Sequence, residues 1–278
     1  MLKKTIGMGG FTLAEVLITL GIIGVVAAMT MPTLINSTQG AQYKTGFKKA
    51  LTVLSQAVVM NIALNDYDLS QVVAGTNTAA EKEESSPGAG DGAEATVLGG
   101  AQSLYDLFSN RLNIVRTAAG SDFDATAGSS NQWLIVSDTD SDDRTTYKTN
   151  HCKGGCTNDY PGFATGGKWA DDATIIMMND GISFIFDNTQ DTCQKANTDI
   201  GVANDSYCFG FIDVNGQKAP NRVVQCDGAG GADAANRPDG SDDFACTVSN
   251  PTDIYPIALY DQSVIPASAA ARAVLYNK

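Results

Sequence analysis

Residues 9–29 read GGFTLAEVLITLGIIGVVAAM and open a long apolar run. From Phe11 to Ile35 the chain has 25 residues and a single ionisable side chain, that of Glu15. At a helical rise of about 1.5 Å per residue, this length crosses a hydrocarbon core of about 30 Å. The sequence therefore predicts a membrane-spanning helix over residues 11–35.

Positive charge flanks this run on its amino-terminal side. Lys3 and Lys4 precede it, and the next basic residue is Lys44. Because flanking Lys and Arg stay on the cytoplasmic side, we expect a single pass with the N-terminus inside and the remaining chain outside. A secretory signal has a shorter apolar core, about 7 to 15 residues, with its cleavage site after the core. The run does not fit that alternative.

The residues at the start of the run resemble the leader of the type IV pilin and type II secretion pseudopilin family. Gly10 stands before the family's cleavage site, Phe11 after it, Glu15 at the family's glutamate, and Pro32 at the family's usual place in the helix. The resemblance implies cleavage and N-methylation by a prepilin peptidase/methyltransferase. It also implies that Glu15 pairs with the α-amino group of Phe11 on a neighbouring subunit. Pro32 has no backbone N–H, so we expect it to kink or locally open the helix.

The same resemblance implies a structural subunit of a type II secretion pseudopilus or a type IV pilus-like filament. Its partners are then other pilin or pseudopilin subunits and a membrane assembly platform. The subunit is expected first in the bacterial cytoplasmic (inner) membrane and then in a cell-surface or periplasmic filament. The alternative is a minor or tip pilin whose head is an adhesion or substrate-recognition module. A formal net charge of −13 argues against a nucleic-acid partner, because a phosphate backbone requires clustered Lys and Arg.

After Pro32 the apolar pattern becomes one-sided. Apolar residues recur at intervals of three and four, the period of an amphipathic helix: Tyr43, Phe47, Leu51, Leu54, Val58 and Ile62. Asn61 is expected on another face. The pattern predicts one long helix from Thr12 to Leu64.

The expected organisation has four parts. They are a leader at 1–10, a membrane-spanning half-helix at 11–35, an amphipathic half-helix at 36–64 and an extracytoplasmic globular head at 65–278.

Several runs in the head predict β-strands, because they are apolar and bounded by turn residues. They are NQWLIVS (131–137), ATIIMMNDGISFIFD (173–187), YCFGFIDVNG (207–216) and DIYPIALYD (253–261). In the second run, Asp180-Gly181 predicts a tight two-residue hairpin. A helix is expected over AQSLYDLFSNRLNIV (101–115), with loops over 76–95 and 117–130. A helix followed by antiparallel strands predicts an α+β fold, in keeping with the pilin-like layout that the leader implies.

A second, looser resemblance lies in FIDVNGQKAPN (211–221), which is similar to a segment common in pseudopilin-like proteins. Asp213, Asn215, Pro220 and Asn221 carry it.

Six cysteines lie in the second half of the chain. For a head outside the cytoplasm they predict disulfides. The nearest-neighbour pairing is one of 15 possible connectivities: Cys152 with Cys156, Cys193 with Cys208, and Cys226 with Cys246. A zinc site at His151 lacks a second close pair of ligands at the spacing of a finger or ribbon.

Acidic loops supply the oxygen ligands that calcium prefers. Asp239, Asp242 and Asp243 form the candidate calcium site, and no other cofactor is expected. The cluster from Asp138 to Asp143 lacks the glycine and the terminal glutamate of an EF-hand loop. The chain has one histidine and no G-x-S-x-G motif, so we expect no enzyme.

Overall fold

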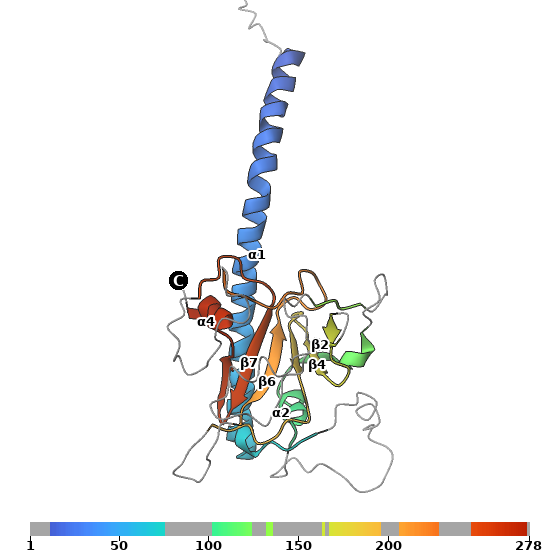
Figure 1. Cartoon of the computed structure of the whole chain (residues 1–278), viewed down its shortest axis with the longest axis vertical. Helices are drawn as coiled ribbons and strands as arrows, with labels where there is room; N and C mark the ends of the chain where they lie inside the picture. The colour runs from blue at the N-terminus through green and yellow to red at the C-terminus, as the bar shows by residue number, and fades with distance from the viewer. Residues whose placement is uncertain are drawn as a thin grey trace, which may run out of the picture. The chain divides into compact units, whose positions relative to one another are not determined.

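The structure is a computed structural model of the whole chain. It describes residues 12–75, 102–123, 132–135, 163–164, 167–195, 206–227 and 246–276, apart from the side chains of 32–37 and 163–164. The chain divides into two compact units, Met1–Ala41 and Gln42–Lys278. Helix α1 (Leu13–Asn65) begins in the first unit and ends in the second, which also holds an antiparallel sheet and shorter helices (Figure 1).

Helix α1 is one continuous helix of 53 residues that includes Pro32. The predicted limits, Thr12 and Leu64, differ from the observed ones by one residue at each end. The helix ends where Asp66 takes a φ of 54°, since a residue in the left-handed region cannot continue a right-handed helix. The Asp66 N–H donates to the carbonyl of Ile62 at 2.9 Å and satisfies one of the last helical acceptors.

The apolar stripe on the second half of α1 is confirmed. Phe47, Leu51, Leu54 and Val58 are buried in the core of the second unit. Asn61 was predicted on another face, and this was wrong, because its side chain is fully buried. Its Nδ2 donates to the carbonyl of Tyr67 at 2.8 Å, so a polar residue on the buried face fixes the chain reversal that follows the helix.

Six strands form one antiparallel sheet, and their order across the sheet follows the chain. In that order they are β1 (Ile114–Ala119), β4 (Thr174–Met178), β5 (Ser183–Phe186), β6 (Cys208–Asp213), β7 (Ile254–Tyr260) and β8 (Ser263–Pro266). Strands β2 (Phe163–Ala164) and β3 (Lys168–Trp169) pair separately. A helix with an antiparallel sheet confirms the predicted α+β class, and strands lie in three of the four predicted runs.

The hairpin between β4 and β5 has a longer loop than the sequence predicted. Met178 N–H donates to the carbonyl of Ile182 at 2.9 Å, and Gly181 N–H donates to the carbonyl of Met178 at 3.1 Å. Three residues therefore lie in the loop. Gly181 has a φ of 84°, and Asp180 is not among the residues with positive φ. This matches a type I turn followed by a left-handed glycine rather than the predicted two-residue turn.

The segment between 101 and 137 differs most from the prediction. Helix α2 (Leu104–Ser109) is only six residues long, because Ile114 and Val115 already belong to β1. The loop expected from residue 117 begins with the last three residues of β1 and the 3-10 helix Gly120–Asp122. In NQWLIVS, residues 133–135 are not in a strand. The Trp133 side chain packs into the core instead.

Both faces of the sheet are covered within the second unit. One face packs on α1, α2 and the C-terminal helix α4 (Ala269–Tyr276) through the core that contains Phe47 and Phe184. The other face carries a second core with Trp133, Trp169 and Phe211. All six residues of β6 are consequently buried. Neither β8 nor α4 was predicted.

Candidate functional site

The first turn of α1 carries the acidic residue that the sequence singled out. Thr12 precedes the helix, and both its backbone N–H and its hydroxyl donate to Glu15 Oε2 at 2.9 Å. In return, the Glu15 N–H donates to the Thr12 hydroxyl at 3.3 Å. This reciprocal arrangement is a capping box, which satisfies backbone donors at the start of a helix. Glu15 therefore has a role within its own helix, which it caps.

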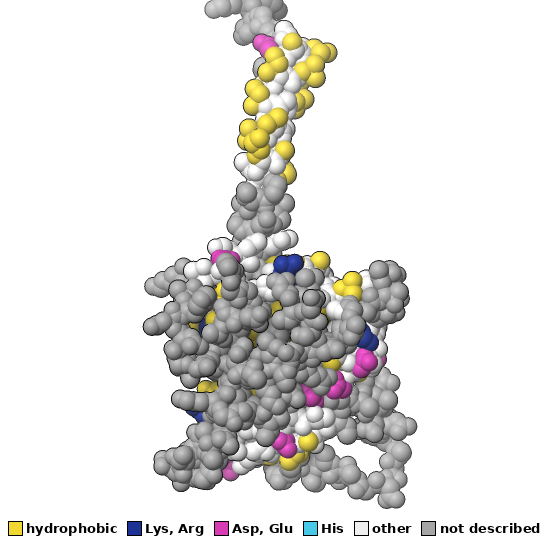
Figure 2. All heavy atoms as spheres, viewed as in Figure 1, with side chains coloured by type: hydrophobic (Ala, Val, Ile, Leu, Met, Phe, Trp, Pro, Cys, Tyr) yellow, Lys and Arg dark blue, Asp and Glu magenta, His cyan; other side chains and the backbone are white. Residues whose placement is uncertain are grey.

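Apolar side chains surround this turn on the amino-terminal part of α1. The large apolar residues between Leu13 and Met31 are 44% to 78% exposed, and Figure 2 shows hydrophobic side chains along the length of this segment. Among the described residues, two helical segments are long and apolar enough to cross a membrane, Leu13–Met31 and Thr38–Asn65. None of the first is buried, whereas 39% of the second is. Leu13–Met31 is therefore the candidate membrane anchor or signal sequence.

The other leader residues remain predictions. Gly10 and Phe11 lie outside the described residues. Pro32 lies within α1, which continues on both sides of it, and its role as a kink stays a prediction.

Two of the three expected disulfides are present. Cys193 bonds to Cys208 with 5.0 Å between their Cα atoms, and Cys226 bonds to Cys246 with 5.3 Å. The first connects the segment after β5 to the start of β6. The third predicted pair, Cys152 with Cys156, lies outside the described residues.

The predicted calcium residues Asp239, Asp242 and Asp243 also lie outside the described part of the chain, as does His151. In the part that is described, no group of three or more His, Cys, Asp or Glu side chains is arranged to hold a metal ion. The calcium prediction for this acidic loop therefore stays a prediction.

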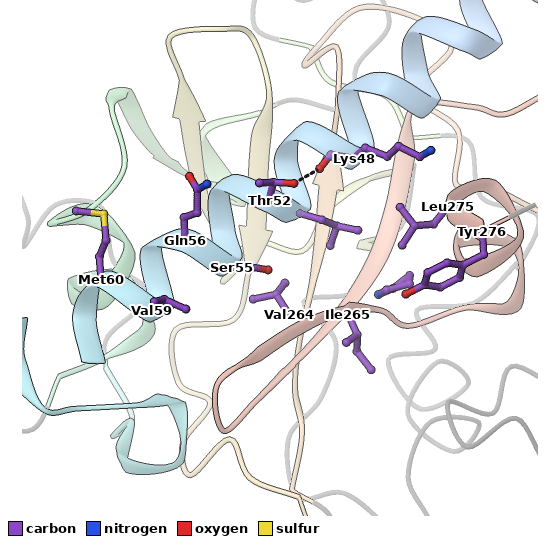
Figure 3. A pocket seen from close by; sticks show the side chains of 12 residues that line it. Lys48, Thr52, Ser55, Gln56, Val59, Met60, Val264, Ile265, Leu275 and Tyr276 are labelled. Carbon is purple, nitrogen blue, oxygen red and sulfur yellow. Dashed lines mark hydrogen bonds between the residues drawn. The ribbon is translucent and has the colours of Figure 1, made fainter. Parts of the chain in front are cut away.

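A groove of about 730 Å³ lies on the second unit between α1, β8 and α4 (Figure 3). The Thr52 hydroxyl bonds to the carbonyl of Lys48 within the helix at 2.9 Å. The lining includes Leu51, Val59, Met60, Val264, Ile265 and Leu275. The rest of the lining is Lys48, Thr52, Ser55, Gln56, Pro266 and Tyr276, so apolar side chains predominate and the groove has the character of a packing surface.

Sequence reasoning missed two polar arrangements. The T-x-x-E pattern at Thr12 and Glu15 is a capping signal that local spacing alone could have revealed. The second arrangement joins Asn221, in the looser resemblance, to the buried Asp253 more than thirty residues later, whose Oδ2 accepts the Asn221 N–H at 2.7 Å. Local spacing contains no signal for that contact.

Comparison of the chain with protein-family models, with curated proteins and with solved structures finds no match in any of the three.

Proposed function

We propose that the chain is a structural subunit of a type II secretion pseudopilus or type IV pilus-like filament. In this proposal a prepilin peptidase cuts between Gly10 and Phe11, and the mature subunit polymerises through α1. One observation carries the proposal. A single carboxylate lies in the first turn of the predominantly apolar, exposed segment Leu13–Met31 of α1, a few residues after the Gly10-Phe11 motif that resembles a prepilin cleavage site.

The hydrogen bonds of Glu15 support a further partner. Both Thr12 donors bond to Oε2, and no described residue donates a hydrogen bond to Oε1. The capping box gives the Glu15 carboxylate hydrogen-bond donors but does not neutralise its negative charge. An ionised carboxylate in an apolar helix is costly in a membrane unless it is hydrated or paired. The α-amino group of Phe11 on a neighbouring subunit, created by cleavage, supplies a matching positive charge.

The test is Glu15→Gln in full-length protein expressed in cells that assemble the filament. Glutamine keeps an acceptor oxygen for Thr12 and removes the charge. We expect normal leader cleavage, read from electrophoretic mobility, and normal membrane insertion. The yield of sheared filaments should fall about tenfold or more. The reason is that a charge-assisted hydrogen bond contributes about 1.5 to 3 kcal/mol, and 1.4 kcal/mol is about tenfold in an equilibrium constant.

Thr12→Val is the matched control, since it removes the hydroxyl from the cap and leaves the charge. It should keep most of the filament yield. Normal yield from Glu15→Gln, or an equal loss from Thr12→Val, would show that Glu15 acts by capping its own helix and not by pairing between subunits. The abundance of the wild-type chain in the sheared fraction also separates a main fibre subunit, which dominates the fraction, from a tip module present in traces.

A further inference from the structure

The groove on the second unit is long and leaves large apolar side chains exposed. It follows α1 from Lys48 to Met60, with β8 and α4 on its other side (Figure 3). At about 1.5 Å per helical residue, this part of α1 is about 18 Å long. Val59, Met60 and Tyr276 line the groove and are exposed. Exposed apolar residues gathered on one surface indicate a binding site.

The walls of the groove offer few hydrogen bonds to a ligand. On the helix wall, the Thr52 hydroxyl already donates to the carbonyl of Lys48 at 2.9 Å. Gln56 is exposed to solvent, and Ser55 is the other polar residue on this wall. On the facing wall, β8 is the last strand of the sheet and contains Pro266, which has no backbone N–H. Because unpaired peptide groups are costly to desolvate, this lining suits an alkyl chain better than an extended peptide.

A positive charge lies at one end of the groove. Lys48 is the one charged residue among the described residues that line it. Its side chain lies at the end where Leu275 and Tyr276 approach α1, and Met60 lies at the opposite end (Figure 3). No ion pair joins Lys48 to a carboxylate in the described part of the chain. The groove is therefore complementary to a molecule with one anionic end and a long apolar body.

We propose that this surface, from Lys48 to Met60 of α1 with β8 and α4, binds one long-chain fatty acid; we call it the acyl groove. The carboxylate lies at Lys48 and the alkyl chain follows α1 toward Met60. The hydrocarbon core of a bilayer is about 30 Å thick, so one acyl chain spans about half of that thickness, about 15 Å. That length fits within the groove. Its volume of about 730 Å³ lies in the usual range for small-molecule sites.

The dimensions favour a fatty acid over two other occupants. A phospholipid would leave its second acyl chain outside a single groove. An α-helix with its side chains is about 10 to 12 Å across, so over the same length it fills at least about 1,400 Å³, which is more than the groove holds. A helix of a second copy would therefore lie largely outside it. The acyl groove goes beyond the proposed function and does not depend on filament assembly.

The test uses the full-length chain in nanodiscs of phosphatidylcholine. The probe is palmitate that carries a photoreactive diazirine, and labelled peptides are identified by mass spectrometry after irradiation. We expect label in the peptides that contain Leu51–Met60 and residues 264–275. Excess unlabelled palmitate should remove most of this label, because a binding site saturates. Label in the apolar segment Leu13–Met31 is the internal reference, since non-specific labelling from the bilayer does not saturate.

Lys48→Glu replaces the positive end of the acyl groove by a negative one and should weaken palmitate binding about tenfold. Lys218→Glu is the matched control, since Lys218 is exposed, lies outside the groove lining and undergoes the same change in charge. It should bind palmitate like the wild type. Thr52→Trp fills the groove from the exposed side of α1 and should abolish the label that competes with palmitate. The near-UV circular dichroism of each variant checks its fold.

Three results would overturn the proposal. The first is a wild type whose groove peptides take no label, or take label that unlabelled palmitate does not reduce. The second is an equal loss of binding in Lys48→Glu and Lys218→Glu, which would show that only the net charge of the chain matters. The third is an amine-reactive cross-link from Lys48 to another copy of the chain that palmitate does not reduce, which would assign the groove to a second copy.

Discussion

Replacing Phe47 by alanine removes the largest side chain that α1 contributes to the core of the second unit. The Phe47 ring is fully buried and stacks on Tyr255 of β7, with 4.1 Å between centroids and 10° between planes. Truncating a buried Phe to Ala costs about 3 to 5 kcal/mol. Loss of an aromatic pair contributes about 0.5 to 1.5 kcal/mol beyond buried area, which places Phe47→Ala in the upper part of that range.

This cost has a measurable size. In a unit of this length, 1 kcal/mol shifts the Tm by about 2 to 4 °C, so we expect a decrease of about 8 to 20 °C. Thermal unfolding of the full-length chain in detergent, followed by near-UV circular dichroism, measures it. Val59→Ala is the control, because Val59 lies on the same helix and is 57% exposed. Equal and small shifts in the two variants would refute the packing of α1 on the sheet.

Three further predictions concern the second unit. Burial raises the pKa of Asp213, so the folded chain holds a proton there that the unfolded chain releases, and this group favours folding most below its ordinary pKa of 3.8. That contribution is lost as the pH rises through the raised pKa, and urea unfolding over a pH series should show a flatter profile for Asp213→Asn than for the wild type. Replacing Cys193 and Cys208 together by serine should lower the free energy of unfolding by about 2 to 5 kcal/mol. After reduction, this difference between the wild-type and variant proteins should disappear, because neither then has the Cys193–Cys208 disulfide. Asn61→Ala leaves the Tyr67 carbonyl without its donor and should cost about 1 to 3 kcal/mol, while Gln56→Ala on the exposed face of α1 should change the urea midpoint little.

The helices and strands whose sequences have a regular pattern of apolar residues could be predicted from the sequence. The apolar run and the three-and-four spacing of Phe47, Leu51, Leu54 and Val58 give helix α1 directly, because the run has the length of a membrane-spanning helix and the spacing specifies one face of a helix. Strands β4, β5, β6 and β7 are continuous apolar runs between turn residues, so they too are visible locally.

The remaining elements depend on contacts made far along the chain. Strand β1 reads IVRTAA, with no alternation, and it exists because it pairs with β4. Trp133 lies in an apolar run without forming a strand, since its ring fills a core beside Trp169 at 6.0 Å between centroids. The buried face of α1 can hold the polar side chain of Asn61 because this side chain donates a hydrogen bond to the carbonyl of Tyr67, which lies beyond the end of the helix. The meeting of Asp213 with Asp253 likewise depends on the register of β6 and β7.

The order of strands across the sheet has a consequence for how the chain can acquire its structure. Each strand of the six pairs with the one that precedes it in that sheet. A sheet of this kind can grow outward from one edge, and no strand has to be inserted between two others already paired. The β4–β5 and β7–β8 pairs, which are joined by the shortest connections, carry the smallest loop-closure penalty. The topology therefore suits a polypeptide that becomes available for folding progressively, from its amino-terminal end.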